Sequence, residues 1–127
     1  MIDANADSDD RSINDDTVLW RRLPQNGVAT DSSAPNGRRP SSANFADAEL
    51  SVVIAAECIG GTDRLLKNHA GFGVFAFRVA DARSVGWGVV RAPDDNLPGH
   101  AHVTGRKTHG QRSKVAKLSQ IVVEPRN

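Results

Sequence analysis

The chain has few aromatic residues, one cysteine and no long apolar run. Aromatic side chains make up 5% of its 127 residues and tyrosine is absent, which leaves little material for the surfaces on which nucleic-acid bases stack. Cys58 is alone, so an intramolecular disulfide is excluded, and in its apolar stretch a small buried side chain is more common than a reactive thiol. No run reaches the ~18 apolar residues of a membrane helix, and no leader-like segment is visible, so we expect a soluble, cytoplasmic protein without membrane contact.

The length and apolar content predict one small domain. Hydrophobic residues make up 39% of the chain, which suffices for a single modest core. Residues 49–56 and 71–79 are apolar on both alternating faces and are expected to be central strands. Further strands are expected at 17–23, 89–91, 100–104 and 120–123, short helices at 63–69, 80–86 and 111–118, and a long loop at 25–40. This pattern predicts an α+β domain over residues 17–125, with a mixed, mostly antiparallel sheet of four to six short strands and two or three short helices.

The charges of the two ends are opposite. Residues 1–16 carry six aspartates against Arg11, a balance of −5, with almost no apolar content. Such a segment buries too little surface to offset its ordering entropy, so we expect a disordered acidic tail. Residues 105–127 have a balance of +5. A basic end suggests an anionic partner, although a solvated charged surface explains the same pattern.

A strand with imidazoles on one face is expected at residues 100–104. Ala101 and Val103 alternate with His100, His102 and Thr104, which separates an apolar face from a polar one. Two histidines spaced in this way can ligate a transition metal, but a third ligand is not evident and we predict no metal. The favoured interpretation is that one histidine takes part in a polar site and the other is exposed.

Basic and hydroxyl side chains gather in three other places. Gly105–Lys117 offers Arg106 and Lys107 for phosphate oxygens, or is simply a solvated basic helix. The remaining candidates are Arg21 and Arg22 of the first strand and Arg38, Arg39, Ser41 and Ser42 before the second. Arg21 and Arg22 face opposite sides of a strand, so only one of them can enter a site on a given face. The other four can bind a phosphate or carboxylate, or the two serines can satisfy a surface turn. We expect His100, Arg21 or Arg22, Arg39 and Ser41 to share one polar cleft.

The segments LWRR, RPSSANF, LSV, VVRAP and HAHVTG resemble those of a small family of uncharacterised bacterial proteins. The segments lie at Leu19–Arg22, Arg39–Phe45, Leu50–Val52, Val89–Pro93 and His100–Gly105 and are followed by a basic tail, so that the resemblance covers roughly residues 18–123. The family has no known activity, so the resemblance implies no function. Its pattern has an apolar residue in place of His102, which weakens the metal interpretation and gives His100 more weight.

A second resemblance is to RES-domain and ADP-ribosyltransferase-like folds, which grip NAD with an arginine on a first strand and a serine before a later one. The resemblance would give these roles to Arg21 or Arg22 and to Ser41 or Ser42. The chain departs from that pattern because no suitably placed catalytic glutamate follows: Glu57 comes too early and Glu124 lies near the end.

Three functions remain open, and whether the protein is an enzyme is one of the open questions. The favoured one is a binding module, without a cofactor, for an anionic partner such as a nucleic acid or a phosphorylated ligand. The second is a small nucleotide-acting enzyme of NAD-consuming type, in which His100 is the general acid or base, because histidine titrates near neutral pH. The third is a protein-interaction domain without catalysis. The sequence does not indicate the oligomeric state.

Overall fold

The described part of the chain, residues 9–126 of a computed structural model, contains eight strands and three α-helices. The strands are β1 (Val18–Leu23), β2 (Val28–Thr30), β3 (Arg38–Pro40), β4 (Leu50–Ile54), β5 (Gly73–Arg78), β6 (Gly88–Arg91), β7 (His100–Thr104) and β8 (Gln120–Val123). The helices are α2 (Gly61–Leu66), α3 (Val79–Arg83) and α4 (His109–Leu118). None of the helices in this range could span a bilayer.

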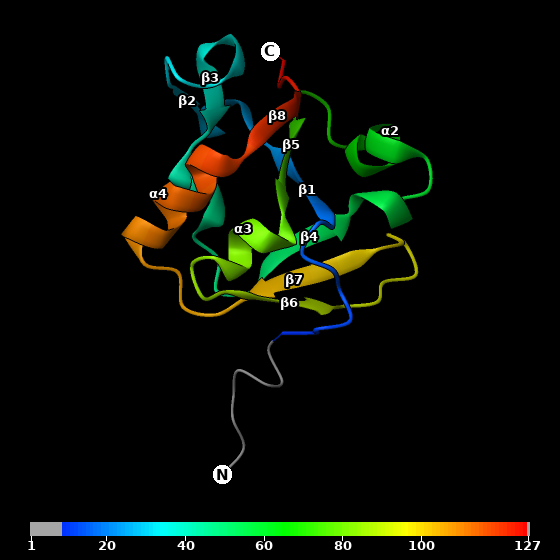
Figure 1. Ribbon diagram of the computed structural model, residues 1–127. Coiled ribbons are helices and arrows are strands. Elements are labelled where there is room, and N and C mark those ends of the chain that lie inside the picture. Colours follow the sequence, from blue (N-terminus) through cyan, green and yellow to red (C-terminus); the bar gives the residue numbers. More distant parts are fainter. Residues whose placement is uncertain (1–8, 127) are drawn as a thin grey trace.

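Six of the strands form one sheet in the order β6-β7-β4-β1-β5-β8, while β2 and β3 form a separate hairpin (Figure 1). Every neighbouring pair is antiparallel. The predicted α+β class is therefore confirmed, and the main sheet has the largest strand number expected. β8 lies at one edge of the sheet and β6 at the other.

The two faces of the sheet carry separate apolar clusters. On one face, buried residues of α3 and α4 pack with Phe45 and Phe75 in the larger cluster. On the other face, Leu65 of α2 packs with Val53 and Cys58 in the smaller one. β4 and β5 contribute to both clusters, as expected for central strands. Cys58 is buried as predicted, and burial raises the pKa of its thiol.

The alternation predicted for β7 is confirmed. Ala101 and Val103 are fully buried in the larger cluster. His100 and His102 are only partly buried and lie on the opposite face. β7 pairs with β4 through the register that sets Ser51 opposite His102. Because α2 covers only part of this second face, the imidazoles border solvent.

The expected long loop at 25–40 is instead organised around the β2–β3 hairpin. The carboxylate of Asp31 accepts hydrogen bonds from the hydroxyl and amide of Ser33, at 2.7 and 3.0 Å. It also pairs with Arg39 at 2.8 Å. The Ser33 hydroxyl and amide, followed by Arg39, lower the pKa of Asp31 to about 2. These local bonds, which composition does not reveal, give the segment its structure.

The predicted disordered tail is corrected for residues 9–16, whereas its first eight residues lie outside the described range. Arg83 of α3 contacts the carboxylates of Asp9 at 3.1 Å and Asp15 at 2.7 Å. Asp9 also accepts a hydrogen bond from the amide of Val89, and Ile13 is 3% exposed in the larger cluster. The aspartates of this segment thus serve as acceptors for the domain, and the folded unit begins before residue 17.

Candidate functional site

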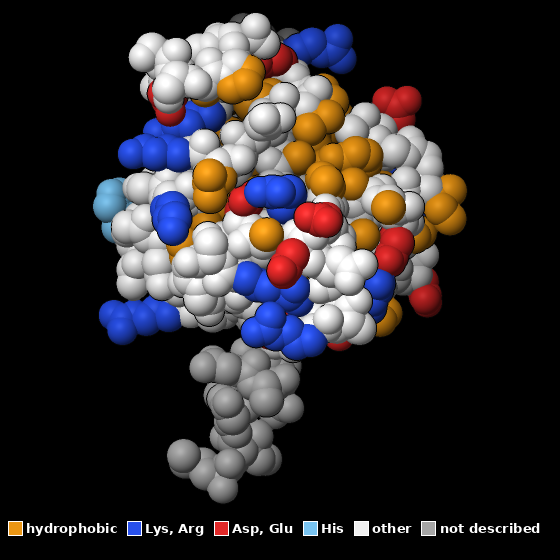
Figure 2. Space-filling view, in the orientation of Figure 1, with side chains coloured by type: hydrophobic (Ala, Val, Ile, Leu, Met, Phe, Trp, Pro, Cys, Tyr) orange, Lys and Arg blue, Asp and Glu red, His pale blue; other side chains and the backbone are white. Residues whose placement is uncertain are grey.

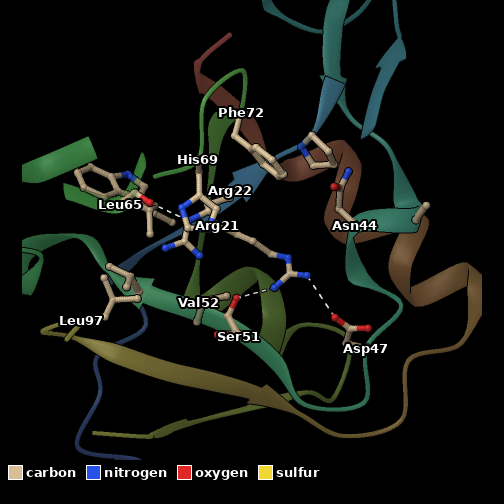
Figure 3. A pocket seen from close by; sticks show the side chains of 14 residues that line it. Arg21, Arg22, Asn44, Asp47, Ser51, Val52, Leu65, His69, Phe72 and Leu97 are labelled. Atoms are coloured by element: carbon tan, nitrogen blue, oxygen red, sulfur yellow. Dashed lines mark hydrogen bonds and ion pairs between the residues drawn. The ribbon is translucent and has the colours of Figure 1, made fainter. Parts of the chain in front are cut away.

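β1 and β4 diverge, and Arg21 reaches across the space between them. β1 pairs with β4 only at Leu19 and Trp20, whereas it pairs with β5 along all six of its residues. Beyond that point, Nη1 of Arg21 donates to the backbone carbonyl of Ser51 at 2.7 Å, and Nη2 lies 3.2 Å from Asp47 Oδ2 (Figure 3). Burial lowers the pKa of the Arg21 guanidinium, but an arginine stays charged at neutral pH. Arg21 therefore ties the separated strands together.

Two adjoining cavities open at this separation and extend along α2. One has a volume of about 530 Å³ and lies between β1, β4 and the 3-10 turn Ser42–Phe45. The other, of about 560 Å³, lies between α2, β4 and the turn before β7 and is lined by His100. Arg22, Ser51 and Leu97 line both cavities. We refer to the two cavities together as the cleft.

The cleft carries more positive than negative side chains. Its charged residues are Arg21, Arg22, Arg64 and Lys67 against Asp47 and Asp94. Nε of Arg22 donates to the carbonyl of Leu65 at 2.7 Å, and within residues 9–126 its two terminal nitrogens have no hydrogen-bond partner. Arg64 donates to the carbonyl of Asn96 at 2.7 Å. Burial lowers the pKa of Arg22. Arg22 is thus a positioned cation whose terminal nitrogens are available as hydrogen-bond donors.

His100 joins a serine hydroxyl to a backbone carbonyl. Its Nδ1 lies 2.7 Å from the carbonyl oxygen of Ala92, and its Nε2 lies 2.5 Å from Oγ of Ser51. Since a carbonyl oxygen only accepts, Nδ1 carries a proton and donates it. In the neutral imidazole the lone pair is then on Nε2, where it accepts the hydroxyl proton of Ser51. The ring is held by a bond on each side.

His102 lies beside His100 but does not complete a metal site. The two rings meet edge to face with centroids 5.1 Å apart. Nδ1 of His102 is 3.7 Å from the carboxylate of Glu49, whose side chain is 75% exposed. Within residues 9–126, no group of three or more His, Cys, Asp or Glu side chains is placed to hold a metal ion.

The arginines before the second central strand lie outside this cleft. Arg38 pairs with Glu124 at 3.0 Å, and Arg39 pairs with Asp31 in the β2–β3 hairpin. Ser41 accepts a hydrogen bond at its backbone carbonyl from Asn44, at 3.0 Å, and Asn44 itself lines the first cavity. The expected meeting of four residues in one cleft is therefore right for His100 with Arg22 and wrong for Arg39. Ser41 lies next to a lining residue, and Ser42 begins the adjacent 3-10 turn.

The basic candidates after β7 do not face the cleft either. Nζ of Lys107 donates to the carbonyls of Ala48 and Gly105 and lies 5.5 Å from the ring centroid of Trp87. Burial lowers the pKa of this ammonium group. Arg106 is exposed. On the face seen in Figure 2, basic and acidic side chains lie beside one another, as on a solvated surface.

Sequence reasoning missed Ser51 and Arg64. Ser51 is the one polar residue inside the apolar run LSVVI, and a polar position in a doubly covered strand is a signal for a local opening. Arg64 belongs to a short helix with ordinary surface composition and gives no such signal.

Comparison of the chain with profiles of known protein families, with curated proteins and with solved structures gives no match. The two family resemblances of the sequence thus stay predictions.

Proposed function

We propose that the protein binds a small phosphorylated ligand in the cleft. The observation that carries this proposal is the hydrogen bonding of the Arg22 guanidinium. Its Nε is anchored on the carbonyl of Leu65, while its terminal nitrogens have no partner within residues 9–126 and the side chain lines both cavities. A guanidinium held on one side presents a rigid pair of donors, which is the geometry that phosphate oxygens accept.

The surroundings of Arg22 favour an anion of more than one charge. Arg64 and Lys67 line the second cavity with it, and Lys67 has no ion-pair partner in the described range. Asp94, the acidic side chain that lines this cavity, accepts a hydrogen bond from the backbone amide of Asn96. A phosphate group offers three acceptor oxygens and up to two charges, so it can engage several of these cations at once, which a single carboxylate cannot.

The size of the cleft supports a small ligand over an extended polyanion. Its cavities, of about 530 and 560 Å³, fall in the range of roughly 300–1,000 Å³ typical of small-molecule sites. The outer candidates Arg38, Arg39 and Lys107 already have partners within the protein. An extended phosphate backbone would have to displace those contacts, whereas the donors of Arg22 are available.

Calorimetric titration with AMP and with inorganic phosphate tests the proposal. The variant Arg22→Met keeps an unbranched side chain but removes the donors, and Arg38→Met is the matched control on the surface. A charge-assisted hydrogen bond contributes about 1.5–3 kcal/mol, so we expect Arg22→Met to weaken AMP binding by a factor of about ten or more. Arg38→Met should change the affinity less than about twofold.

Three outcomes count against the proposal. The first is the absence of AMP and phosphate binding at millimolar concentration. The second is an equal loss of affinity in Arg22→Met and Arg38→Met. The third is retention on heparin that depends on Arg106 and not on Arg22, which would favour the nucleic-acid alternative and place the anion-binding surface outside the cleft.

A further inference from the structure

We infer that Ser51 is a nucleophile activated by His100 and that the protein transfers the acyl group of an ester that carries an anionic group. The anionic part of this inference rests on the proposed function, since the anion is the one bound by Arg22. The nucleophile itself rests on different contacts, those of Ser51 and His100.

The hydrogen bonds run in the direction that activation needs. A serine hydroxyl becomes a nucleophile when a base takes its proton and a third group holds that base. Nε2 of His100, at 2.5 Å from Oγ of Ser51, is the accepting nitrogen because Nδ1 donates to Ala92. The carbonyl of Ala92 fixes the ring and the tautomer, the role that a carboxylate has in many serine hydrolases.

Ser51 differs from four other serines of the described residues 9–126. The hydroxyls of Ser12, Ser33, Ser84 and Ser119 donate to carbonyl or carboxylate oxygens. An oxygen acceptor of that kind does not take up the proton at neutral pH. The hydroxyl of Ser51 instead meets an imidazole nitrogen, the group that most often acts as a general base in enzymes, and the residue is exposed and lines both cavities.

The reaction follows from these positions. Oγ of Ser51 attacks the carbonyl carbon of the ester, and its proton moves to Nε2 of His100. The negative charge that develops on the carbonyl oxygen lies in a cleft with an excess of cations, Arg22 among them. The bond to the leaving oxygen breaks, and that oxygen takes the proton from Nε2. Water then attacks the acyl carbon while Nε2 of His100 takes its proton. The bond from this carbon to Oγ of Ser51 breaks, the acid leaves, and Oγ takes the proton back from Nε2.

A tagged, uncharged alkyl fluorophosphonate tests the inference. Its phosphorus is attacked by an activated serine, the P–F bond breaks and fluoride leaves, so the protein gains a mass that peptide mapping assigns. We expect one label per chain on Ser51, none on Ser51→Ala, and a labelling rate about 100-fold lower for His100→Gln, since general base catalysis contributes roughly 10²–10⁴-fold. His102→Gln, which alters the neighbouring imidazole, should keep nearly the full rate.

The controls separate a reactive pair from a structural one. Glutamine keeps a hydrogen-bonding side chain at position 100 but is not a base, so His100→Gln should retain the circular dichroism spectrum while its labelling slows about 100-fold. Equal labelling of the wild type and Ser51→Ala, or of the wild type and His100→Gln, overturns the inference. Arg38→Met, which lies outside the cleft, should be labelled at the wild-type rate. Labelling without AMP binding would defeat only the proposed function, and AMP binding without labelling would defeat only the nucleophile.

Discussion

Replacing Arg21 by methionine should destabilise the fold by about 2 kcal/mol. The change removes the hydrogen bond to the carbonyl of Ser51, at 2.7 Å, and the ion pair with Asp47, at 3.2 Å. A hydrogen bond from a charged donor contributes about 1.5–3 kcal/mol, and an exposed ion pair about 0.2–1 kcal/mol. The Ser51 carbonyl borders a cavity that water can enter, so the lower part of the first range applies. Methionine preserves much of the packing of the arginine stem.

Urea unfolding followed by circular dichroism measures this loss, provided that the transition is two-state. Two further variants divide it between the contacts. Asp47→Asn removes only the ion pair, whose acid is 66% exposed, and should cost less than about 1 kcal/mol. Arg21→Lys replaces the planar fork by a single ammonium and should fall between the two. For a domain of this size we expect the melting temperature of Arg21→Met to drop by about 8 °C.

Two results would refute the reasoning. If Asp47→Asn is as destabilising as Arg21→Met, the ion pair and not the bond to the backbone joins the strands. If Arg21→Met is neutral, neither contact contributes to the stability of the fold. The labelling of Ser51 gives an independent readout, because the guanidinium fixes the carbonyl of that residue. Arg21→Met should slow the labelling, while Asp47→Asn should leave it nearly unchanged.

Two further predictions concern the stability of the fold. A Cβ at Gly73 would lie 2.0 Å from the carbonyl oxygen of Val123, so Gly73→Ala should lower the free energy of unfolding by about 1–3 kcal/mol. A Cβ at Gly110 meets open space, so Gly110→Ala should leave the free energy of unfolding unchanged or raise it by up to about 1 kcal/mol. Equal effects of the two variants in urea unfolding would contradict the strained contact at Gly73. The pKa of Asp31 in the folded protein is about 2, against an ordinary value of 3.8, and the Ser33 hydroxyl is the main cause. The ionised carboxylate therefore stabilises the fold fully above pH 3.8, and this stabilisation is lost as the pH falls through about 2. Asp31→Asn should therefore flatten the dependence of stability on pH in that window, and an unchanged slope would rule this out.

Most of the main sheet could be predicted because its strands carry strong local patterns. The alternation of Ala101 and Val103 with the imidazoles indicates one buried and one polar face, and the structure has this arrangement. The apolar runs of β4 and β5 indicate strands with cover on both sides, which the two clusters confirm. Periodicity works here because burial against the helices decides which side chains face inward.

Residues 9–16 and the β2–β3 hairpin were predicted wrongly because composition averages over residues. An acidic segment with little apolar content reads as disordered, yet Ile13 alone is enough to reach the core. Asp9 and Asp15 then find one arginine, Arg83, that is 68 to 74 positions away in the sequence. Contacts between residues so far apart in the sequence cannot be recognised from the composition or periodicity of a short segment.

The candidate site could be predicted only in part for the same reason. His100 stands out in its strand, but its partner Ser51 lies 49 positions earlier, as the one polar residue inside an otherwise apolar run. The two meet because β4 pairs with β7, a neighbour relation that the order of elements in the chain does not reveal. The carbonyl of Ala92, which orients the ring, belongs to the backbone and has no sequence signal at all.

The consecutive arginines of β1 show how strand geometry divides similar residues between structure and ligand. Neighbouring side chains of a strand leave in opposite directions. The terminal nitrogens of Arg21 donate hydrogen bonds to Ser51 and Asp47 (Figure 3). Arg22 instead points toward α2, where only its Nε donates a hydrogen bond within the described part of the chain. A register continued past Trp20 would set Arg22 opposite Ser51, but the strands have parted there. The parting therefore creates both the need for Arg21 as a tie and the space in which Arg22 can meet an anion.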